Sequence, residues 1–365
     1  MKIEKLSVVL GEQIETNQQL IDKLKSQVAP EELFEIKRLL ELSGAENRRL
    51  SSKHLSPSQY LEKAFEPLKK YKDDIEIVIN TGITKGVIEP AQGALYCQKL
   101  DLHQSQTFDI TEACNSLVRG LQIAHSMFVS GYAKKYILII SNEINDRETS
   151  PLRQFSKIQS VQDLQTLFAG LTTGVSSTCM LLSNAKDIEW KFLFEADNKI
   201  ASDCTVALPN YKDFVPLKGY QKDRANSVRE WTFCSNHNAF LRKTSQVRKL
   251  IKKYGINEFK NSDVIFVHSH SKSYWDMVLK PFDVQDKLFG LYPSHGNLST
   301  GTLPVSLLTK YPSQIPKNTK IIYLAGSAGF SLGLIELKTL ENIVYTDNKR
   351  NRAISSNRTK TYALG

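Results

Sequence analysis

Apolar, β-branched segments alternate along the chain with segments in which apolar residues recur every three to four positions. The first kind predicts strands and the second predicts amphipathic helices. Strands are predicted at residues 3–10, 75–80, 106–110, 135–141, 175–183, 188–196, 262–268, 319–325 and 331–337. Helices are predicted at about 16–26, 30–42, 57–71, 91–100, 115–130, 239–254, 271–280 and 300–310. Continuous apolar strands between helices indicate sheets covered on both faces, and hence an α/β layered architecture.

The two halves of the chain follow a similar plan. Each opens with helical patterns and continues with strands that end in polar or glycine-rich turns, although the sequence alone does not establish a repeat. We expect an N-terminal half at 1–185, a C-terminal half at 186–340 and a basic, partly disordered tail at 341–365. The stretch 197–235, rich in charges and turn residues, predicts an irregular connection or the wall of a pocket entrance.

The composition is that of an ordinary globular protein. The chain has 365 residues, 41% of them hydrophobic and 24% charged, so it can bury a large core. No apolar run approaches the roughly 20 residues that span a bilayer. The first ten residues are too few and too charged for a signal peptide, so we expect a cytoplasmic protein that does not bind membranes.

The cysteines are scattered and do not form a paired motif. Their spacing argues against a disulfide framework and against a zinc site, and a reducing compartment would leave the thiols free. The five are Cys97, Cys114, Cys179, Cys204 and Cys234. We expect no bound metal.

The formal net charge of +10 raises the question of a nucleic-acid partner. The basic residues are spread over helical surfaces, as at 69–72 and 248–253, and no nucleic-acid motif accompanies them. We therefore expect no nucleic-acid binding. A solvated surface is the simplest interpretation, and a landing surface for an acidic carrier domain or for the phosphates of coenzyme A is the alternative.

Cys114 is the first candidate for chemistry. It stands between a short strand and the periodic helix 115–130, which turns Leu117, Leu121 and Phe128 to one face. A thiol in the first turn of a helix faces unpaired backbone N–H groups and the positive end of the helix dipole. Both favour thiolate, the nucleophilic form, although such a cysteine is more often a packing residue.

Three places in the C-terminal half are candidates to join Cys114. His268 ends a strand, at the sheet edge where α/β proteins place active groups, although His270 and His295 compete with it. Asn297 precedes a helix and offers an amide, or simply caps that helix. The run 324–331 is a small-residue turn whose backbone N–H groups can approach a ligand closely, or a tight connection and nothing more.

The order of these motifs resembles the thiolase-fold condensing enzymes, specifically the β-ketoacyl-acyl-carrier-protein synthase III group. The resemblance covers residues 1 to about 337. It rests on six segments in order: Glu15-Thr16-Asn17, Ser43 to Arg49, Ala113-Cys114, Val267-His268, Gly296-Asn297-Leu298-Ser299, and Ala328 to Gly333. It implies a duplicated, five-layered αβαβα fold that dimerises through its N-terminal half.

The resemblance also implies roles. Cys114 would take an acyl group as a thioester from an acyl-CoA or an acyl carrier protein, with no further cofactor. His268 and Asn297 would donate hydrogen bonds to the carbonyl of a second thioester, and the backbone N–H groups of Cys114 and Ala328 would hold the oxyanion of the first. The expected reaction is a Claisen-type condensation in fatty-acid, polyketide or related biosynthesis.

A finer resemblance concerns the source of the carbon nucleophile. Residues 79–90 and 168–174 look like the branch that joins two acyl-CoA chains head to head in olefin biosynthesis. In that branch a Glu before Pro reaches into the partner protomer's pocket as the base, and Glu89 stands at that position. The alternative for Glu89 is an exposed loop residue. Glu112 is a second candidate base, or a salt-bridged structural residue.

Several positions depart from the family pattern. Asn115-Ser116 follow the nucleophile where small residues are usual, which is expected to add bulk near the thioester. Ala328 replaces a Gly and is expected to need a conformation that Gly reaches more easily. The aromatic residue that stacks on adenine has no counterpart in 33–42. Decarboxylative condensation, acyl delivery to an alcohol or amine, and a non-catalytic partner subunit remain alternatives.

Overall fold

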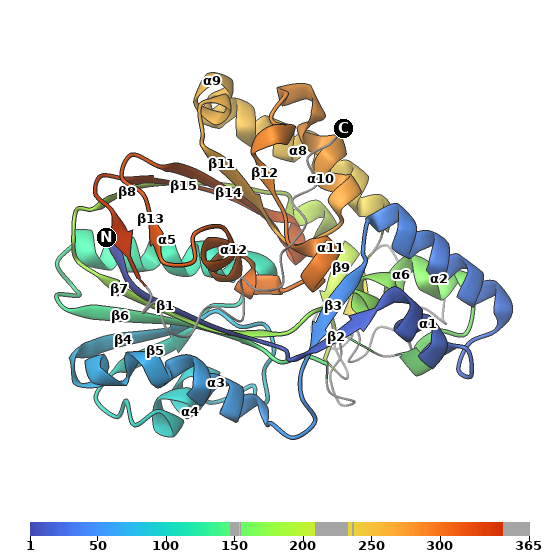
Figure 1. The fold of residues 1–365 in the computed structure, drawn as a ribbon, viewed down its shortest axis with the longest axis horizontal. Coiled ribbons are helices and arrows are strands. Elements are labelled where there is room, and N and C mark those ends of the chain that lie inside the picture. Colours follow the sequence, from blue (N-terminus) through green and yellow to red (C-terminus); the bar gives the residue numbers. More distant parts are fainter. Residues whose placement is uncertain (147–152, 154, 209–232, 236, 346–365) are drawn as a thin grey trace.

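The protein is built on two five-stranded mixed sheets, seen in a computed structural model that describes residues 1–146, 153, 155–208, 233–235 and 237–345 (Figure 1). The first sheet has the strand order β1-β7-β6-β4-β5 and the second has the order β12-β11-β14-β15-β8. The first comprises β1 (Lys2–Leu10), β4 (Ile75–Asn80), β5 (Gln106–Asp109), β6 (Tyr136–Glu143) and β7 (Ser176–Ser183). The second comprises β8 (Ile188–Ala196), β11 (Val264–Val267), β12 (Leu288–Phe289), β14 (Lys320–Gly326) and β15 (Ser331–Thr339).

The two sheets repeat one topology. In the first, β1 and β6 run antiparallel to β7, and β4 pairs in parallel with both β6 and β5. In the second, β8 and β14 run antiparallel to β15, and β11 pairs in parallel with both β14 and β12. One sheet takes its strands from residues 2–183 and the other from residues 188–339. The duplication that the sequence left open is therefore visible in the strand pairing.

Helices form three layers around these sheets (Figure 1). The helices are α3 (Pro57–Phe65), α4 (Gln92–Lys99), α5 (Ser116–Val129), α8 (His237–Tyr254), α10 (Lys272–Leu279) and α12 (Thr302–Lys310). The apolar faces of α5 and α12 lie between the sheets in one core cluster. A second cluster packs α3 and α4 on the outer face of the first sheet, and a third packs α8 and α10 on the outer face of the second. The result is a five-layered αβαβα arrangement.

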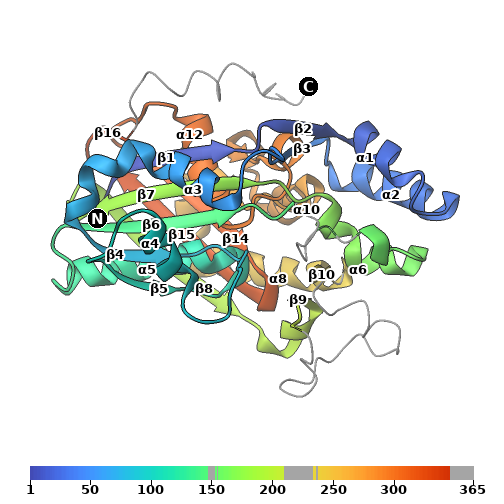
Figure 2. The ribbon, with the colours of Figure 1, turned by 90° about the horizontal axis from the view of Figure 1, so that it is seen from below.

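A helical lobe extends from one end of the sheets (Figure 2). It contains α1 (Asn17–Leu24), α2 (Pro30–Ser43) and α6 (Val161–Leu171), joined to the sheets by the ribbon β2 (Gln13–Thr16) and β3 (Asn47–Leu50). Arg48 of β3 is fully buried beneath it. Its guanidinium lies 3.7 Å from the Glu15 carboxylate and donates to Asn17 and to the Leu171 carbonyl, so one buried cation joins three segments of the lobe.

The predicted strands and helices are found, with local differences. The helix predicted at 57–71 ends at Phe65 and continues as a 3₁₀ helix over Glu66–Asp74, because Pro67 has no N–H to continue the α-helical pattern. Within the stretch predicted to be irregular, β9 (Cys204–Val206) pairs with β10 (Phe233–Ser235). The ribbon β2–β3 and the helix α6 were not predicted.

The remaining α-helices and strands of the described residues are short. They are α9 (Ile256–Lys260), α11 (Tyr292–His295), β13 (Gln314–Ile315) and β16 (Ile343–Val344). Residues 209–232 of the predicted irregular stretch and 346–365 of the predicted tail lie outside the described residues. In the part of the chain that the structure describes, no helix combines the length and apolarity needed to cross a membrane.

Candidate active site

Cys114 lies in the turn directly before α5, a helix of the central layer. It is the middle residue of a one-turn 3₁₀ helix, η2 (Ala113–Asn115), and α5 begins two residues later at Ser116. The helix predicted at 115–130 is thus found after the thiol, and its start differs from the prediction by one residue. Ala113 has φ +46°, a left-handed conformation that is uncommon without Gly, and such conformations are concentrated at functional turns. The Cys114 side chain is partly buried.

The second half of the duplication supplies a matching turn. A 3₁₀ turn, η8 (Ser299–Gly301), precedes α12 as η2 precedes α5, and Ser299 also has positive φ, at +50°. The Ser299 hydroxyl lies 3.8 Å from Cys114 Sγ and is placed to donate to it. The two equivalent turns of the repeat thus meet at the candidate nucleophile.

Ser299 also connects Cys114 to the other two candidate residues. Its N–H donates to Asn297 Oδ1 at 2.9 Å, and its carbonyl accepts from the Thr302 hydroxyl at 2.8 Å. The Thr302 hydroxyl in turn lies 3.3 Å from Nδ1 of the buried His268. The structure therefore brings Cys114, His268 and Asn297 into one hydrogen-bonded group, across up to 185 residues of sequence.

Asn297 is held in a defined orientation. Its backbone N–H donates to the Thr172 carbonyl at 2.8 Å, and its carbonyl accepts from the Gly174 N–H at 2.9 Å. Because Oδ1 accepts the Ser299 N–H, the amide presents Nδ2, a donor, on its other side. It does not cap α12, whose N-cap residue, Gly301, makes no side-chain cap.

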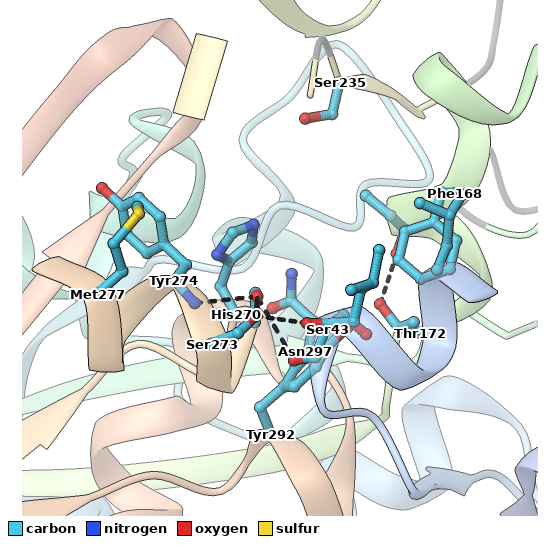
Figure 3. A pocket seen from close by; sticks show the side chains of 14 residues that line it. Ser43, Phe168, Thr172, Ser235, His270, Ser273, Tyr274, Met277, Tyr292 and Asn297 are labelled. Carbon is cyan, nitrogen blue, oxygen red and sulfur yellow. Dashed lines mark hydrogen bonds between the residues drawn. The ribbon is translucent and has the colours of Figure 1, made fainter. Parts of the chain in front are cut away.

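A cavity of about 350 Å³ reaches Asn297 (Figure 3). It lies between α2, α6 and α10, and Leu42 and Met277 on its wall are partly exposed to solvent. The full lining is Leu39, Leu42, Ser43, Phe168, Ala169, Thr172, Ser235, His270, Ser271, Ser273, Tyr274, Met277, Tyr292 and Asn297. All of the lining side chains are apolar or uncharged polar groups apart from the imidazole of His270.

The competing histidines have other surroundings. His270 lines the cavity, and its ring meets the ring of Tyr274 edge-on at 5.6 Å. His295 is buried, with Nδ1 2.7 Å from the Ser294 hydroxyl. Burial and the nearby Arg49 cation lower the pKa of His295 to about 4, so at neutral pH it is an uncharged packing residue.

Glu112 is a structural residue in this arrangement. Its carboxylate pairs with Arg119 at 2.8 Å and accepts from Asn115 Nδ2 at 2.9 Å and from the Ser331 hydroxyl. Burial opposes its ionisation, but the hydrogen bonds from Arg119, Ser331 and Asn115 outweigh burial, so the pKa of Glu112 lies below its usual value. An acid of lowered pKa is a poor proton acceptor, which favours the structural interpretation of Glu112.

Two expectations about departures from the family pattern were wrong. Asn115 does not add bulk beside the thiol: it is fully buried and directed at Glu112 and Ser331 of β15, in the interface between the halves. Ala328 does not take the conformation that favours glycine, since positive φ occurs at Gly329 (70°) and Phe330 (56°). The methyl group of Ala328 is accommodated because the two residues with positive φ follow it in the chain.

Ala328 is nevertheless close to the nucleophile turn. The 3₁₀ turn η9 (Ala328–Phe330) packs against η2, and the Ser327 hydroxyl donates to the Glu112 carbonyl at 2.7 Å. The small-residue turn, at the junction of β14 and β15, therefore contacts the turn that carries Cys114.

Glu89 is an exposed residue, as its alternative interpretation expected. It lies on an exposed loop between β4 and α4, next to Ile88, which is 83% exposed. The base of that loop is fixed, because the fully buried Glu143 carboxylate accepts from the Ile83 N–H at 3.1 Å and from the Thr84 hydroxyl at 3.0 Å.

Sequence reasoning missed the residues that connect the site. Ser299 was named only as the last residue of the motif at 296–299, and Thr302 and Glu143 were not singled out. The available signal was the repeat itself, since each half ends a strand, makes a short turn and begins a central helix. Among the described residues, no group of three or more His, Cys, Asp or Glu side chains is arranged to hold a metal ion.

Comparison with known proteins gives related condensing enzymes, although no family model matches the chain. It is 24% identical to β-ketoacyl-[acyl-carrier-protein] synthase III of Phocaeicola vulgatus over 304 residues, covering 80% of this chain and 85% of that protein. It is 20% identical to the acyl-CoA:acyl-CoA alkyltransferase of Xanthomonas campestris over 286 residues, covering 73% and 76%.

The same relationship is found in three dimensions. A variant of Xanthomonas campestris OleA, solved with bound lauric acid and lauroyl-CoA, superposes with a TM-score of 0.72 and 17% identity, covering 92% of this chain and 98% of that one. The duplicated sheets and the five layers are thus those of a known fold. The chain is a homologue of β-ketoacyl-acyl-carrier-protein synthase III and of OleA, and it has the thiolase fold of these condensing enzymes.

Proposed function

We propose that the protein joins two acyl thioesters by Claisen-type condensation in lipid or related biosynthesis, with Cys114 as the residue that takes the first acyl group. The observation that carries the proposal is the position of Ser299, which contacts Cys114 and Asn297 directly and reaches His268 through Thr302. The relationship to β-ketoacyl synthase III and to the acyl-CoA:acyl-CoA alkyltransferase supports condensation over delivery of the acyl group to an alcohol or amine.

Each polar group has a step that suits its chemistry. The Cys114 thiolate attacks the first thioester, and the backbone N–H groups of Cys114 and Ala328 hold the developing oxyanion. The Asn297 amide presents Nδ2 toward the cavity, where it donates to the carbonyl of the second thioester. We assign His268 as the second polar side chain beside that carbonyl. The packing of η9 against η2 supports the role given to Ala328.

The substrates are carried by coenzyme A or by an acyl carrier protein, and no other cofactor is needed. An apolar cavity that ends at Asn297 suits the extended arm of such a carrier or an acyl chain. We propose a cytoplasmic homodimer that is joined through the N-terminal half, where β5 is an edge strand of its sheet. Such a dimer would bring the exposed Glu89 of each protomer to the partner's site.

Intact-protein mass spectrometry tests the acylation step. The protein is incubated with a panel of acyl-CoA and acyl-carrier-protein donors, and the expected result is a mass increase of one acyl group. Cys114→Ser should abolish this increase, whereas Cys97→Ser should retain it, because burial raises the pKa of the Cys97 thiol and leaves it unreactive. Acylation of the Cys114→Ser variant to the wild-type extent would overturn the proposal.

A separate experiment tests Glu89. Glu89→Gln should still be acylated but should lose product formation from two acyl-CoA molecules, because the base for the α-proton is gone. Glu31→Gln, which changes an exposed carboxylate on α2, is the matched control and should keep both steps. If Glu89→Gln forms product normally from two acyl-CoA molecules, the α-proton is removed without Glu89. Product that appears only when a malonyl or β-ketoacyl partner is added would instead indicate decarboxylation.

A further inference from the structure

Glu143, the last residue of β6, is a fully buried carboxylate that accepts hydrogen bonds from two separate segments. In the first segment, the Ile83 N–H donates to it at 3.1 Å and the Thr84 hydroxyl at 3.0 Å. In the second segment, the donor is the hydroxyl of Thr300, which is fully buried in the turn η8. Burying a carboxylate is costly unless hydrogen bonds compensate it, so the three donors have to stay close to Glu143.

The directions of these hydrogen bonds fit the capacity of each group. Three donors are within the capacity of a carboxylate, which accepts up to about four hydrogen bonds. Because Thr300 gives its single hydrogen to Glu143, the neighbouring Ser141 hydroxyl donates to Thr300. Ser141 and Glu143 are two residues apart on β6, so their side chains lie on the same face of the sheet, toward η8. Two side chains of one strand therefore hold Thr300.

The turn that contains Thr300 also contacts the candidate nucleophile. Thr300 directly follows Ser299, whose hydroxyl lies 3.8 Å from Cys114 Sγ and is placed to donate to it. Ser299 has φ +50°, a conformation that costs energy for a residue with a side chain, so neighbouring contacts have to maintain it. The hydrogen bond from Thr300 to Glu143 is one of these contacts. Since a donor at the sulfur favours thiolate, the position of η8 affects the reactivity of Cys114.

The other donors to Glu143 lie at the base of the Glu89 loop, residues 81–91 between β4 and α4. A second contact joins this base to the nucleophile segment, because Lys85 Nζ lies 2.9 Å from the hydroxyl of Thr111, which leads into η2. That contact is exposed to solvent, whereas Glu143 is fully buried, and hydrogen bonds are stronger where water is excluded. Glu143 is therefore the stronger connection between the loop and the turns that meet at the thiol.

We propose that Glu143 is a positioning residue that holds the Glu89 loop and the turn η8 beside Cys114 in one arrangement. It acts through Thr84 on the loop and through Thr300 on the turn, without being a catalytic residue. The inference rests on the proposed function, in which Cys114 takes the acyl group and Glu89 removes the α-proton. In the proposed homodimer Glu89 serves the neighbouring protomer, so one buried carboxylate joins elements of both sites.

Single substitutions separate the two sides of this network in the full-length protein. Thr300→Val removes the bond to η8 and should slow alkylation of Cys114 by iodoacetamide about fivefold, the factor that corresponds to one hydrogen bond. The rate is followed by mass spectrometry of the Cys114 peptide at about pH 7, where it depends on the thiolate fraction. Thr84→Val should leave this rate and acylation unchanged, but should slow product formation from two acyl-CoA molecules about fivefold. Glu143→Ala should show both losses.

Amide hydrogen exchange of residues 85–88 measures the position of the loop without any substrate. Exchange should be faster in Thr84→Val and in Glu143→Ala, because each variant releases the loop base from the buried carboxylate. It should be unchanged in Thr300→Val, which keeps the bonds from the loop to Glu143. Unchanged exchange in Thr84→Val and in Glu143→Ala would refute the positioning of the loop.

Two further variants distinguish positioning from general destabilisation. Glu143→Gln should retain both rates, because its amide oxygen can replace one carboxylate oxygen as acceptor and its NH₂ group can donate to the Thr84 hydroxyl. Thr309→Val is the matched control, since the Thr309 hydroxyl donates to the Val305 carbonyl at 2.7 Å within α12, the helix that follows η8. The control loses one hydrogen bond and should change neither rate. If Glu143→Ala does not fold, the variants at Thr84 and Thr300 carry the test.

The outcomes separate this inference from the proposed function. A wild-type alkylation rate in Thr300→Val or in Glu143→Ala would refute the positioning of η8, even where Cys114 accepts acyl groups normally. Wild-type product formation by Thr84→Val would refute a positioning role in condensation. Failure of every acyl donor to label wild-type Cys114, with alkylation slowed in Thr300→Val and loop exchange faster in Thr84→Val, would instead refute the proposed function and leave the positions held by Glu143 in place.

Discussion

Gly296 is the residue whose substitution should most directly disturb the placement of Asn297. It ends α11 with φ +74° and ψ −166°, a region that is essentially restricted to glycine. A Cβ added there would lie 2.4 Å from the Thr172 carbonyl oxygen and 2.9 Å from Arg48 Cβ. Neither a backbone carbonyl nor a buried arginine stem can move without displacing its own segment.

The cost of Gly296→Ala follows from these contacts. The backbone conformation alone costs about 1–3 kcal/mol for a residue with a side chain. Relief of the contact with Thr172 requires the two loops to separate, which endangers the hydrogen bonds from Asn297 to Thr172 and from Gly174 to Asn297. At about 1 kcal/mol for each bond, the free energy of unfolding should fall by about 3–5 kcal/mol. That is a large part of the about 5–15 kcal/mol typical of a domain.

Urea unfolding followed by tryptophan fluorescence measures the loss of stability. Gly131→Ala is the matched control, because Gly131 also has φ +74° but an added Cβ there meets nothing within 4 Å. The control should lose only the conformational term of about 1–2 kcal/mol. Product formation should fall in Gly296→Ala and not in the control, since only the former displaces Asn297. Equal losses of stability in the two variants would refute the steric reasoning.

Other predictions concern buried ionisable groups. The pKa of His295 is lowered to about 4 in the folded protein. As the pH falls below the usual pKa of histidine, His295 therefore binds a proton in the unfolded chain but not in the folded one. This difference should lower the free energy of unfolding of the wild-type protein by about 2 kcal/mol between about pH 7 and pH 5. His295→Gln should lose that much less over the same range. Equal losses for the two proteins in urea titrations would contradict the burial argument. Glu112, with a lowered pKa, contributes stability that is present above its unfolded value and is lost as the pH falls through its folded value, so Glu112→Gln should flatten the acid limb of the same titration. Glu143→Ala should speed amide hydrogen exchange at Ile83 and Thr84, because the Ile83 N–H and the Thr84 hydroxyl lose the carboxylate that accepts from them. Unchanged exchange would show that Glu143 does not hold the loop.

Local periodicity was sufficient for most secondary structure. The helix at α5 buries Leu117, Leu121 and Phe128 as its spacing predicts, since one face of a helix meets the core every three to four residues. The order of motifs along the chain was also enough to associate Cys114, His268 and Asn297. Helix α3 ends at Phe65 and not at residue 71, because the single residue Pro67 overrides the apolar pattern.

Short and mixed segments were harder to predict. The ribbon β2–β3 has four residues in each strand, and its pairing depends on the lobe that it supports. Helix α6 buries Leu164, Leu167 and Leu171 against α1 and α2, which belong to a part of the chain more than a hundred residues earlier. Such elements are stabilised by contacts that the local sequence does not contain.

The sequence by itself determined the α/β class, the central amphipathic helix and the residue types of the site. Only the tertiary structure decided how those residues are connected. Ser299 meets Cys114 because two equivalent turns, 185 residues apart, are brought together when the two sheets stack on α5 and α12. The tertiary structure likewise directs the Asn115 side chain to Ser331 and away from the thiol. The physical reason is that side-chain direction depends on strand pairing and helix packing between distant segments, whereas periodicity records only which face of each segment is buried.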